Sequence, residues 1–179
     1  IILFFGMIKK VKGLDLLLQS FRKVVEMHPN TVLLIAGKTW EDDFAFYQKI
    51  IDKYRLDGNI ILHKRFISHN DVEYYYGASD LVVLPYKRIY QSGVLMMTLS
   101  YGRPALVSDL PPFKEIIIND ENGFLFKTED ITDLAEKLKI ILSNKQNLER
   151  VQNNGQALAK AQFDWDQIGR LTKKAYQTL

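Results

Sequence analysis

The chain has 179 residues, of which 47 % are hydrophobic and 25 % charged, and its formal net charge is +3. This composition is ordinary for a globular protein, and the small positive charge is too weak to indicate nucleic-acid binding. The absence of cysteine excludes disulfides, cysteine-ligated zinc and thiol catalysis. No apolar run approaches the roughly 20 residues that cross a bilayer.

Six short apolar runs predict β-strands. Most show little polar alternation, which is typical of strands buried on both faces of a parallel sheet. The first run has no charged leader and is too short for a signal peptide. Because the chain opens on this run and not on Met, we expect a fragment that begins on a strand. The runs are Ile1–Phe5, Thr31–Ala36, Asn59–His63, Asp80–Pro85, Pro104–Ser108 and Gly123–Phe126.

Segments with helical spacing lie between these runs. Apolar residues recur at spacings of three and four over residues 14–25, and Pro29 ends this helix. The C-terminal part predicts two further helices, over about 145–160 and 165–178. Three side chains stand where they can cap a helix, namely Thr39, Ser68 and Asp130.

The alternation of strands and helices predicts the fold class. We expect an α/β fold: a doubly wound, Rossmann-like parallel sheet of about six strands with helices on both faces. Residues 1–179 are expected to form a single domain, or one large half of a two-domain protein. In such a sheet, ligands bind at the carboxyl ends of the strands near the topological switch point. The loops that follow the strands are therefore the candidates for a site.

The first two such loops carry glycine and lysine. Gly6–Gly13 follows the first strand and contains Lys9, Lys10 and Lys12. Glycine lets a ligand approach the backbone and lysine binds phosphate as a point charge, although a solvated basic turn is the alternative. Gly37 ends the second strand, where a tight turn is the favoured interpretation over a ligand contact.

The third loop, Pro85–Val94, combines four features of an anion site. It runs from a buried strand to a helix that begins near Ser92, and a helix N-terminus offers free N–H groups and partial positive charge. Ser92 adds a hydroxyl and Gly93 permits close approach, while Lys87 and Arg88 add charge. Ser92 as a plain N-cap is the alternative. We favour an anion site centred on the turn Gln91-Ser92-Gly93.

The fourth loop, Ser108–Glu115, contains two prolines that stiffen it and place Glu115 at the start of a short helix. The alternative is that Glu115 only favours the helix dipole. The sequence offers no conventional catalytic constellation. Its three histidines, His28, His63 and His69, are scattered without metal-ligand spacing, and no Ser-His-Asp arrangement can be assembled.

These loops, in this order, resemble the C-terminal domain of retaining nucleotide-sugar glycosyltransferases of the GT-B "group 1" family. The resemblance extends from residue 3 to about residue 145, and the ordered set of motifs is far more specific than any one motif. It is carried by Phe4-Phe5-Gly6 through Lys12-Gly13-Leu14-Asp15, Ile35-Ala36-Gly37, Ala78–Pro85, Ser100–Asp109, Glu115 and Asn122-Gly123-Phe124-Leu125.

The resemblance implies roles for particular residues. In that family the C-terminal domain binds the nucleotide-sugar donor, which implies that Lys12 contacts the donor phosphates and Lys9 assists. The amides around Gly93-Val94 would receive the diphosphate, and the loop Arg65-Phe66-Ile67 would hold the base. No cofactor or metal is expected, because the nucleotide-diphosphate-sugar is itself the donor substrate.

The sequence departs from the family pattern at three positions. Many members carry Arg directly after the first glycine, where this chain has Met7. Many also carry a Glu-x7-Glu pair, whose positions are Ile89 and Met97 here, and the second glutamate normally meets the ribose. The chain is similar to a subgroup with a Gln-Ser-Gly-Val turn that lacks these carboxylates.

The expected function is donor binding for transfer of a sugar to a polysaccharide, a glycolipid or a related acceptor. The N-terminal acceptor domain is absent from this chain, so the fragment alone is expected to be inactive. A degenerate, non-catalytic domain with an assembly or regulatory role is the alternative. A sugar-nucleotide epimerase is a third possibility, disfavoured because no carboxylate and histidine set suits proton abstraction. We expect a cytoplasmic protein, with peripheral attachment to the inner face of the membrane left open.

Overall fold

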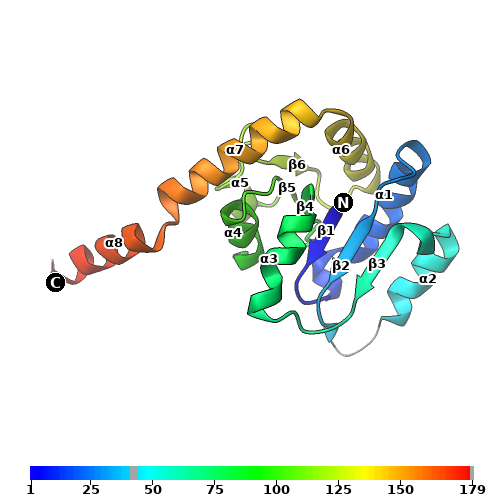
Figure 1. Cartoon of the computed structure of the whole chain (residues 1–179), viewed down its shortest axis with the longest axis horizontal. Coiled ribbons are helices and arrows are strands. Elements are labelled where there is room, and N and C mark those ends of the chain that lie inside the picture. The colour runs from blue at the N-terminus through cyan, green and yellow to red at the C-terminus, as the bar shows by residue number, and fades with distance from the viewer. Residues whose placement is uncertain (41–43, 178–179) are drawn as a thin grey trace.

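The computed structural model describes residues 1–40 and 44–177 (Figure 1). Its centre is a parallel six-stranded sheet with the strand order β3-β2-β1-β4-β5-β6. Each strand lies inside one of the predicted apolar runs, so the predicted fold class is confirmed. The strands are β1 (Ile2–Phe5), β2 (Leu33–Ala36), β3 (Ile60–His63), β4 (Leu81–Leu84), β5 (Ala105–Ser108) and β6 (Phe124–Phe126).

Helices cover both faces of this sheet, and the last one extends away from it (Figure 1). They are α1 (Leu14–Met27), α2 (Ala45–Tyr54), α3 (His69–Ala78), α4 (Gly93–Ser100), α5 (Pro111–Lys114), α6 (Ile131–Ser143), α7 (Lys145–Gln162) and α8 (Trp165–Gln177). Helices α1, α2 and α6 pack on one face, and α3, α4, α5 and the end of α7 pack on the other. The two predicted C-terminal helices are thus confirmed as α7 and α8.

The side chains of the apolar runs belong to two separate hydrophobic cores, one on each face of the sheet. Along β1, Ile2 and Phe4 belong to the core under α1 and α6, whereas Leu3 and Phe5 belong to the core under α3 and α4. Successive side chains of a strand point to opposite faces, so a strand between two helix layers must be apolar at every position. This requirement explains why β1, β2, β4 and β5 lack polar alternation.

Strand β3 does not follow that rule, and the expectation of burial on both faces is wrong for it. Ile60 and Leu62 pack against the first core, but Ile61 is 45 % exposed on the other face. The strand lies at the edge of the sheet, where only one of its faces is covered. Its apolar composition therefore could not reveal the exposed face.

The predicted helix caps differ in outcome. Asp130 is confirmed, because its carboxylate accepts hydrogen bonds from the amides of Thr132 and Asp133 at 3.0 Å each. Ser68 does precede α3 but makes no capping bond with its side chain. The capping box proposed at Thr39 extends into residues 41–43, which lie outside the described residues. Helix α2 itself begins after Phe44.

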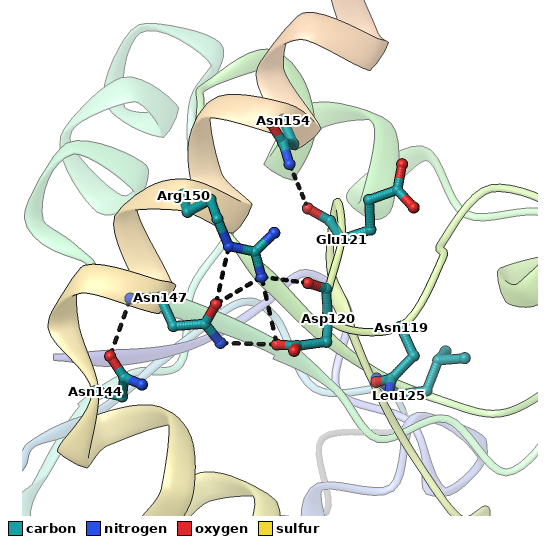
Figure 2. Close-up of polar contacts among 8 residues, drawn as sticks. All are labelled: Asn119, Asp120, Glu121, Leu125, Asn144, Asn147, Arg150 and Asn154. Carbon is teal, nitrogen blue, oxygen red and sulfur yellow. Dashed lines mark hydrogen bonds and ion pairs between the residues drawn. The ribbon is translucent and has the colours of Figure 1, made fainter.

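Side chains of helix α7 form hydrogen bonds with the turn that leads into β6 (Figure 2). Asp120 in this turn has a left-handed φ of 63°, which a non-glycine residue rarely adopts. The Asn147 side chain donates to the Asp120 carboxylate at 2.7 Å, Arg150 binds the Asp120 carbonyl, and Asn154 donates to the Glu121 carbonyl at 2.9 Å. Polar side chains from one face of α7 therefore hold the turn in this conformation.

Candidate functional site

The strand order places the topological switch point between β1 and β4. From β1 the chain winds outward through β2 and β3, whereas from β4 it winds in the opposite direction through β5 and β6. Residues 6–13 follow β1 and residues 85–92 follow β4, so two of the predicted loops meet at the edge where ligands bind in such sheets.

The loop after β1 is built on close backbone contacts. Ile8 donates to the Lys38 carbonyl and Trp40 donates to the Ile8 carbonyl, both at 2.9 Å, so this loop pairs with the one after β2. A Cβ atom on Gly37 would lie 1.9 Å from the Gly6 oxygen. Gly37 is therefore needed for the approach of two protein backbones, in agreement with the tight-turn interpretation.

Gly6 lies next to the start of α4. It has a φ of 100°, and a Cβ atom on it would come within 3.4 Å of the Val94 side chain. The predicted residues Gly6 and Val94 are thus neighbours, although 88 positions separate them. Gly93, beside Val94, has nothing within 4 Å of its Cβ position, so the space in front of the first helical turn is open.

The N-terminus of α4 has the form of an anion site. Ser92 is its N-cap, and its hydroxyl accepts a hydrogen bond from the Leu95 amide at 3.1 Å. Among the described residues, the amides of Gly93 and Val94 have no hydrogen-bond acceptor. Two backbone donors and the positive end of the helix dipole are thus available to a ligand.

Lys12 lies across the switch point, on the ring of Tyr86. Its Nζ is 3.7 Å from the centroid of that ring, which is a cation–π contact. Burial, helped by the nearby charge of Lys9, lowers the pKa of Lys12 to about 8. Lys9 itself stands over the Trp40 ring, with its Nζ 3.7 Å from the centroid. Of the two predicted lysines, only Lys12 is thus in contact with the loop that follows β4.

The other predicted cations occupy different environments. Lys87 donates from its Nζ to Asp15 Oδ2 at 2.8 Å, so it is paired with a carboxylate of α1. The charge that the sequence predicted for the anion site at Lys87 is thus engaged with Asp15 in this structure. Arg88 is exposed at the surface.

A cavity of about 360 Å³ opens beside the start of α4. Its polar wall includes Gln91, Ser92 and Glu115, and its apolar wall includes Met96 and Phe163. Glu115 follows the C-terminal end of α5, not its start, because the two prolines are themselves the first residues of that helix. The predicted position of Glu115 on its helix is therefore wrong, yet the structure brings it to the same cavity as Gln91 and Ser92.

The loop expected to hold a base has two exposed members, Arg65 and Phe66. Phe66 is 70 % exposed, whereas Ile67 is buried in the core under α3. Arg65 forms an ion pair with Asp71 at 3.4 Å. Phe66 and Arg65 are therefore open to a planar ligand, while Ile67 supports the loop from beneath.

The two positions where many family members carry the Glu-x7-Glu pair hold apolar residues here, and these residues lie in apolar surroundings. Ile89 and Met97 pack, partly buried, against the core under α3 and α4. Across residues 1–40 and 44–177, no group of three or more His, Asp or Glu side chains is placed to hold a metal ion. No described helix is both long and apolar enough to span a membrane.

Sequence reasoning missed two residues of this region. Asp15 appeared only as part of a motif, although it binds Lys87. Tyr86 was not singled out, although its ring forms a cation–π contact with Lys12. An available signal for Tyr86 was its position directly after a buried strand, at the edge where the site was sought.

The sequence profile of the family described as "Glycosyl transferases group 1" matches residues 1–158. The chain belongs to this family. Among curated relatives, the GDP-mannose:glycolipid 4-beta-D-mannosyltransferase of Xanthomonas campestris pv. campestris is 30 % identical over 98 % of this chain and 48 % of its own length. The chain thus spans about half the length of the curated relatives that it matches.

Solved structures of group 1 and other glycosyltransferases share the fold. The C-terminal domain of the group 1 family protein LpcC from Francisella tularensis superposes with a TM-score of 0.81 at 22 % identity, covering 92 % of this chain and 86 % of that one. Anabaena Alr3699/HepE, solved in complex with UDP, gives a TM-score of 0.88 at 18 % identity, covering 99 % of this chain and 49 % of that one. The chain has the fold of the C-terminal domain of a GT-B enzyme.

Proposed function

We propose that this chain binds the nucleotide-sugar donor of a group 1 glycosyltransferase. The observation that carries the proposal is that the loop after β1 meets the loop after β4 and the start of α4 at the switch point, with Lys12 on the Tyr86 ring and Gly6 beside Val94. Lys12 and the start of α4 both attract anions, and they belong to the two loops between which ligands bind in this fold. The group 1 membership agrees with this assignment, as does the presence of UDP in the Alr3699/HepE structure.

In the proposed reaction, an acceptor hydroxyl forms a bond to the anomeric carbon and gives up its proton, while the bond between the sugar and the diphosphate breaks and the diphosphate leaves with additional negative charge. The Lys12 ammonium and the amides of Gly93 and Val94 stabilise that charge without reorganising, which is electrostatic catalysis by a preformed site. Lys9 contributes from further out, because its ammonium stands over Trp40. In this proposal the charge is supplied by the chain itself, with neither metal nor cofactor.

The whole protein would combine this domain with an N-terminal half that binds the acceptor. The Xanthomonas relative is named for transfer to a glycolipid, which supports a saccharide or lipid-linked acceptor. Polysaccharide or glycolipid synthesis at the cytoplasmic side of a membrane is the setting that we infer. The non-catalytic alternative is not favoured, because curated relatives carry transferase names.

Titration calorimetry with UDP and GDP tests the proposal. We expect binding by the 179-residue chain and a loss of about tenfold or more in Lys12→Ala, since a charge-assisted contact contributes about 1.5–3 kcal/mol. Lys10→Ala is the matched control, because Lys10 is exposed in the same 3-10 turn, Lys10–Lys12. Absence of binding at millimolar UDP and GDP, or equal losses in the two variants, would argue against the proposed site.

A further inference from the structure

Tyr86 is buried between the two halves of the proposed donor site. Its side chain is 1 % exposed, and its ring packs on Phe113 of α5 with 5.5 Å between the centroids. The face of the same ring receives the Lys12 ammonium at 3.7 Å. One aromatic side chain therefore contacts both the loop after β1 and the helix that lines the cavity.

The backbone on either side of Tyr86 is tied to the loop that carries Lys12. Lys87 donates its amide hydrogen to the Val11 carbonyl at 2.9 Å. Gly13 passes so close to the Pro85 carbonyl that a Cβ atom on it would lie 1.8 Å from that oxygen. The ring of Tyr86 is thus held against Lys12 by contacts that do not involve the ring itself.

The hydroxyl of Tyr86 has no packing explanation. Within the described part of the chain, its oxygen is buried without a hydrogen-bond partner, which costs free energy that a phenylalanine would avoid. Burial raises the pKa of this phenol, and the neighbouring Ser92 side chain opposes the rise. The described contacts of Tyr86 are thus made by its ring and not by its hydroxyl.

We propose that Tyr86 is a positioning residue of the donor site, whose ring holds the Lys12 ammonium beside the loop that leads into α4. This inference rests on the proposed function. The ring favours the charged form of Lys12, because the negative face of an aromatic system attracts a cation. The ring therefore keeps the charged Lys12 next to the loop that ends at the N-terminus of α4.

Two substitutions separate the ring from the hydroxyl. Tyr86→Phe keeps the aromatic face and removes the hydroxyl, whereas Tyr86→Leu removes both. The measurement is the affinity for UDP and GDP by calorimetry, from pH 7 to pH 9.5. Tyr76→Phe is the matched control, because Tyr76 is equally buried and its hydroxyl also lacks a partner, but its ring stacks on Tyr101 and not on a lysine.

We expect Tyr86→Phe to bind UDP and GDP as the wild type does, with the same pH dependence, because the ring and its contact with Lys12 remain. Tyr86→Leu is expected to weaken binding about tenfold or more, and to move the alkaline loss of affinity to lower pH, because Lys12 then loses the contact that favours its charge. Tyr76→Phe should match the wild type in both respects. A wild-type pH profile and affinity in Tyr86→Leu would overturn the role of the ring, and so would a loss of affinity in Tyr86→Phe as large as that in Tyr86→Leu.

Should Tyr86→Leu fail to fold, the wild-type chain still provides a test by NMR. Methylene protons that lie over an aromatic face are shielded, so the Lys12 side chain should give upfield signals, identified by their loss in Lys12→Arg. Ordinary lysine shifts would overturn the inference. The proposed function fails separately, if the wild type binds neither UDP nor GDP or if Lys12→Ala binds both as the wild type does.

Discussion

The Nζ of Lys87 donates a hydrogen bond to Oδ2 of Asp15 at 2.8 Å, and this pair joins the loop after β4 to the first turn of α1. Asp15 is only 9 % exposed, so little water reaches its carboxylate and Lys87 is its ionic partner. The two residues belong to the two loops that meet at the switch point. The ion pair therefore stabilises the arrangement in which the proposed site is formed.

Replacing Lys87 with alanine should reduce stability. The change leaves a largely buried carboxylate without its partner, and we expect a loss of about 1–3 kcal/mol in the free energy of unfolding, less than for a fully buried pair. Urea denaturation measures this loss. The matched control is Glu26→Ala, which breaks the exposed pair Arg22–Glu26 and should cost under about 0.5 kcal/mol. Equal losses in the two variants would contradict a structural role for Lys87.

Gly93→Ala should separate ligand binding from stability. The Cβ position on Gly93 is open, and a helical glycine replaced by alanine gains up to about 1 kcal/mol of stability. If the diphosphate lies against the Gly93 amide, the added methyl group meets the ligand. We therefore expect unchanged or increased stability together with a loss of affinity for UDP and GDP of about tenfold or more.

Two other glycines serve as references for this prediction. Gly13→Ala should unfold or strongly destabilise the chain, because the new methyl group would lie 1.8 Å from the Pro85 oxygen. Gly77→Ala, near the exposed end of α3, should leave binding unchanged and, like Gly93→Ala, leave stability unchanged or increased, since its Cβ position is also open. Full affinity in Gly93→Ala would show that the ligand does not approach this helix end.

The architecture could be predicted because two patterns in the sequence agree. Apolar runs such as Leu33–Ala36 have no polar alternation, and the segments between them have helical spacing, a combination that indicates a parallel sheet between helix layers. The exposed face of β3 could not be predicted. Its residues Ile60–Leu62 are all apolar, and only the strand order reveals that the strand lies at the edge.

The site could be predicted only in part. The rule for ligand positions in open sheets places Lys12 and Gly93 at one edge of the sheet, and the structure brings their loops together. The ion pair between Asp15 and Lys87 could not be predicted from the sequence, because the two residues are 72 positions apart. Nor could spacing reveal that Tyr86 lies beneath Lys12, since a residue after a strand can point either way.

Asn122→Ala should destabilise the turn before β6. The Asn122 side chain accepts from the Ile118 amide at 2.8 Å and donates to the Ile116 carbonyl at 3.0 Å, and the residue is only 5 % exposed. Removing it leaves backbone groups without partners, so we expect a loss of about 2–3 kcal/mol in urea denaturation. Asn154→Ala removes one exposed bond to the same turn and should cost at most about 1 kcal/mol. A larger loss of stability in Asn154→Ala than in Asn122→Ala would contradict this account.

Lys12 should also affect the pH dependence of stability. Its pKa is about 8 in the folded chain against an ordinary 10.5, so between these values the unfolded chain binds more protons. The lysine therefore opposes folding below pH 8, and this cost fades as the pH rises to 10.5. We expect Lys12→Met to be more stable than the wild type at pH 7, with the difference shrinking by pH 10. A difference that stays constant over this range would contradict the lowered pKa.

Binding should show the opposite dependence on pH. A diphosphate attracts Lys12 only in its charged form, so affinity for UDP and GDP is expected to fall as the pH rises above about 8, approaching tenfold per pH unit. Lys12→Arg keeps its charge throughout this range, because the guanidinium pKa lies above 12. Comparing wild type with Lys12→Arg at each pH cancels the ionisation of the ligand itself. We expect the affinity of the wild type to fall relative to that of Lys12→Arg as the pH rises. A constant ratio of the two affinities would show that Lys12 does not contact the phosphates.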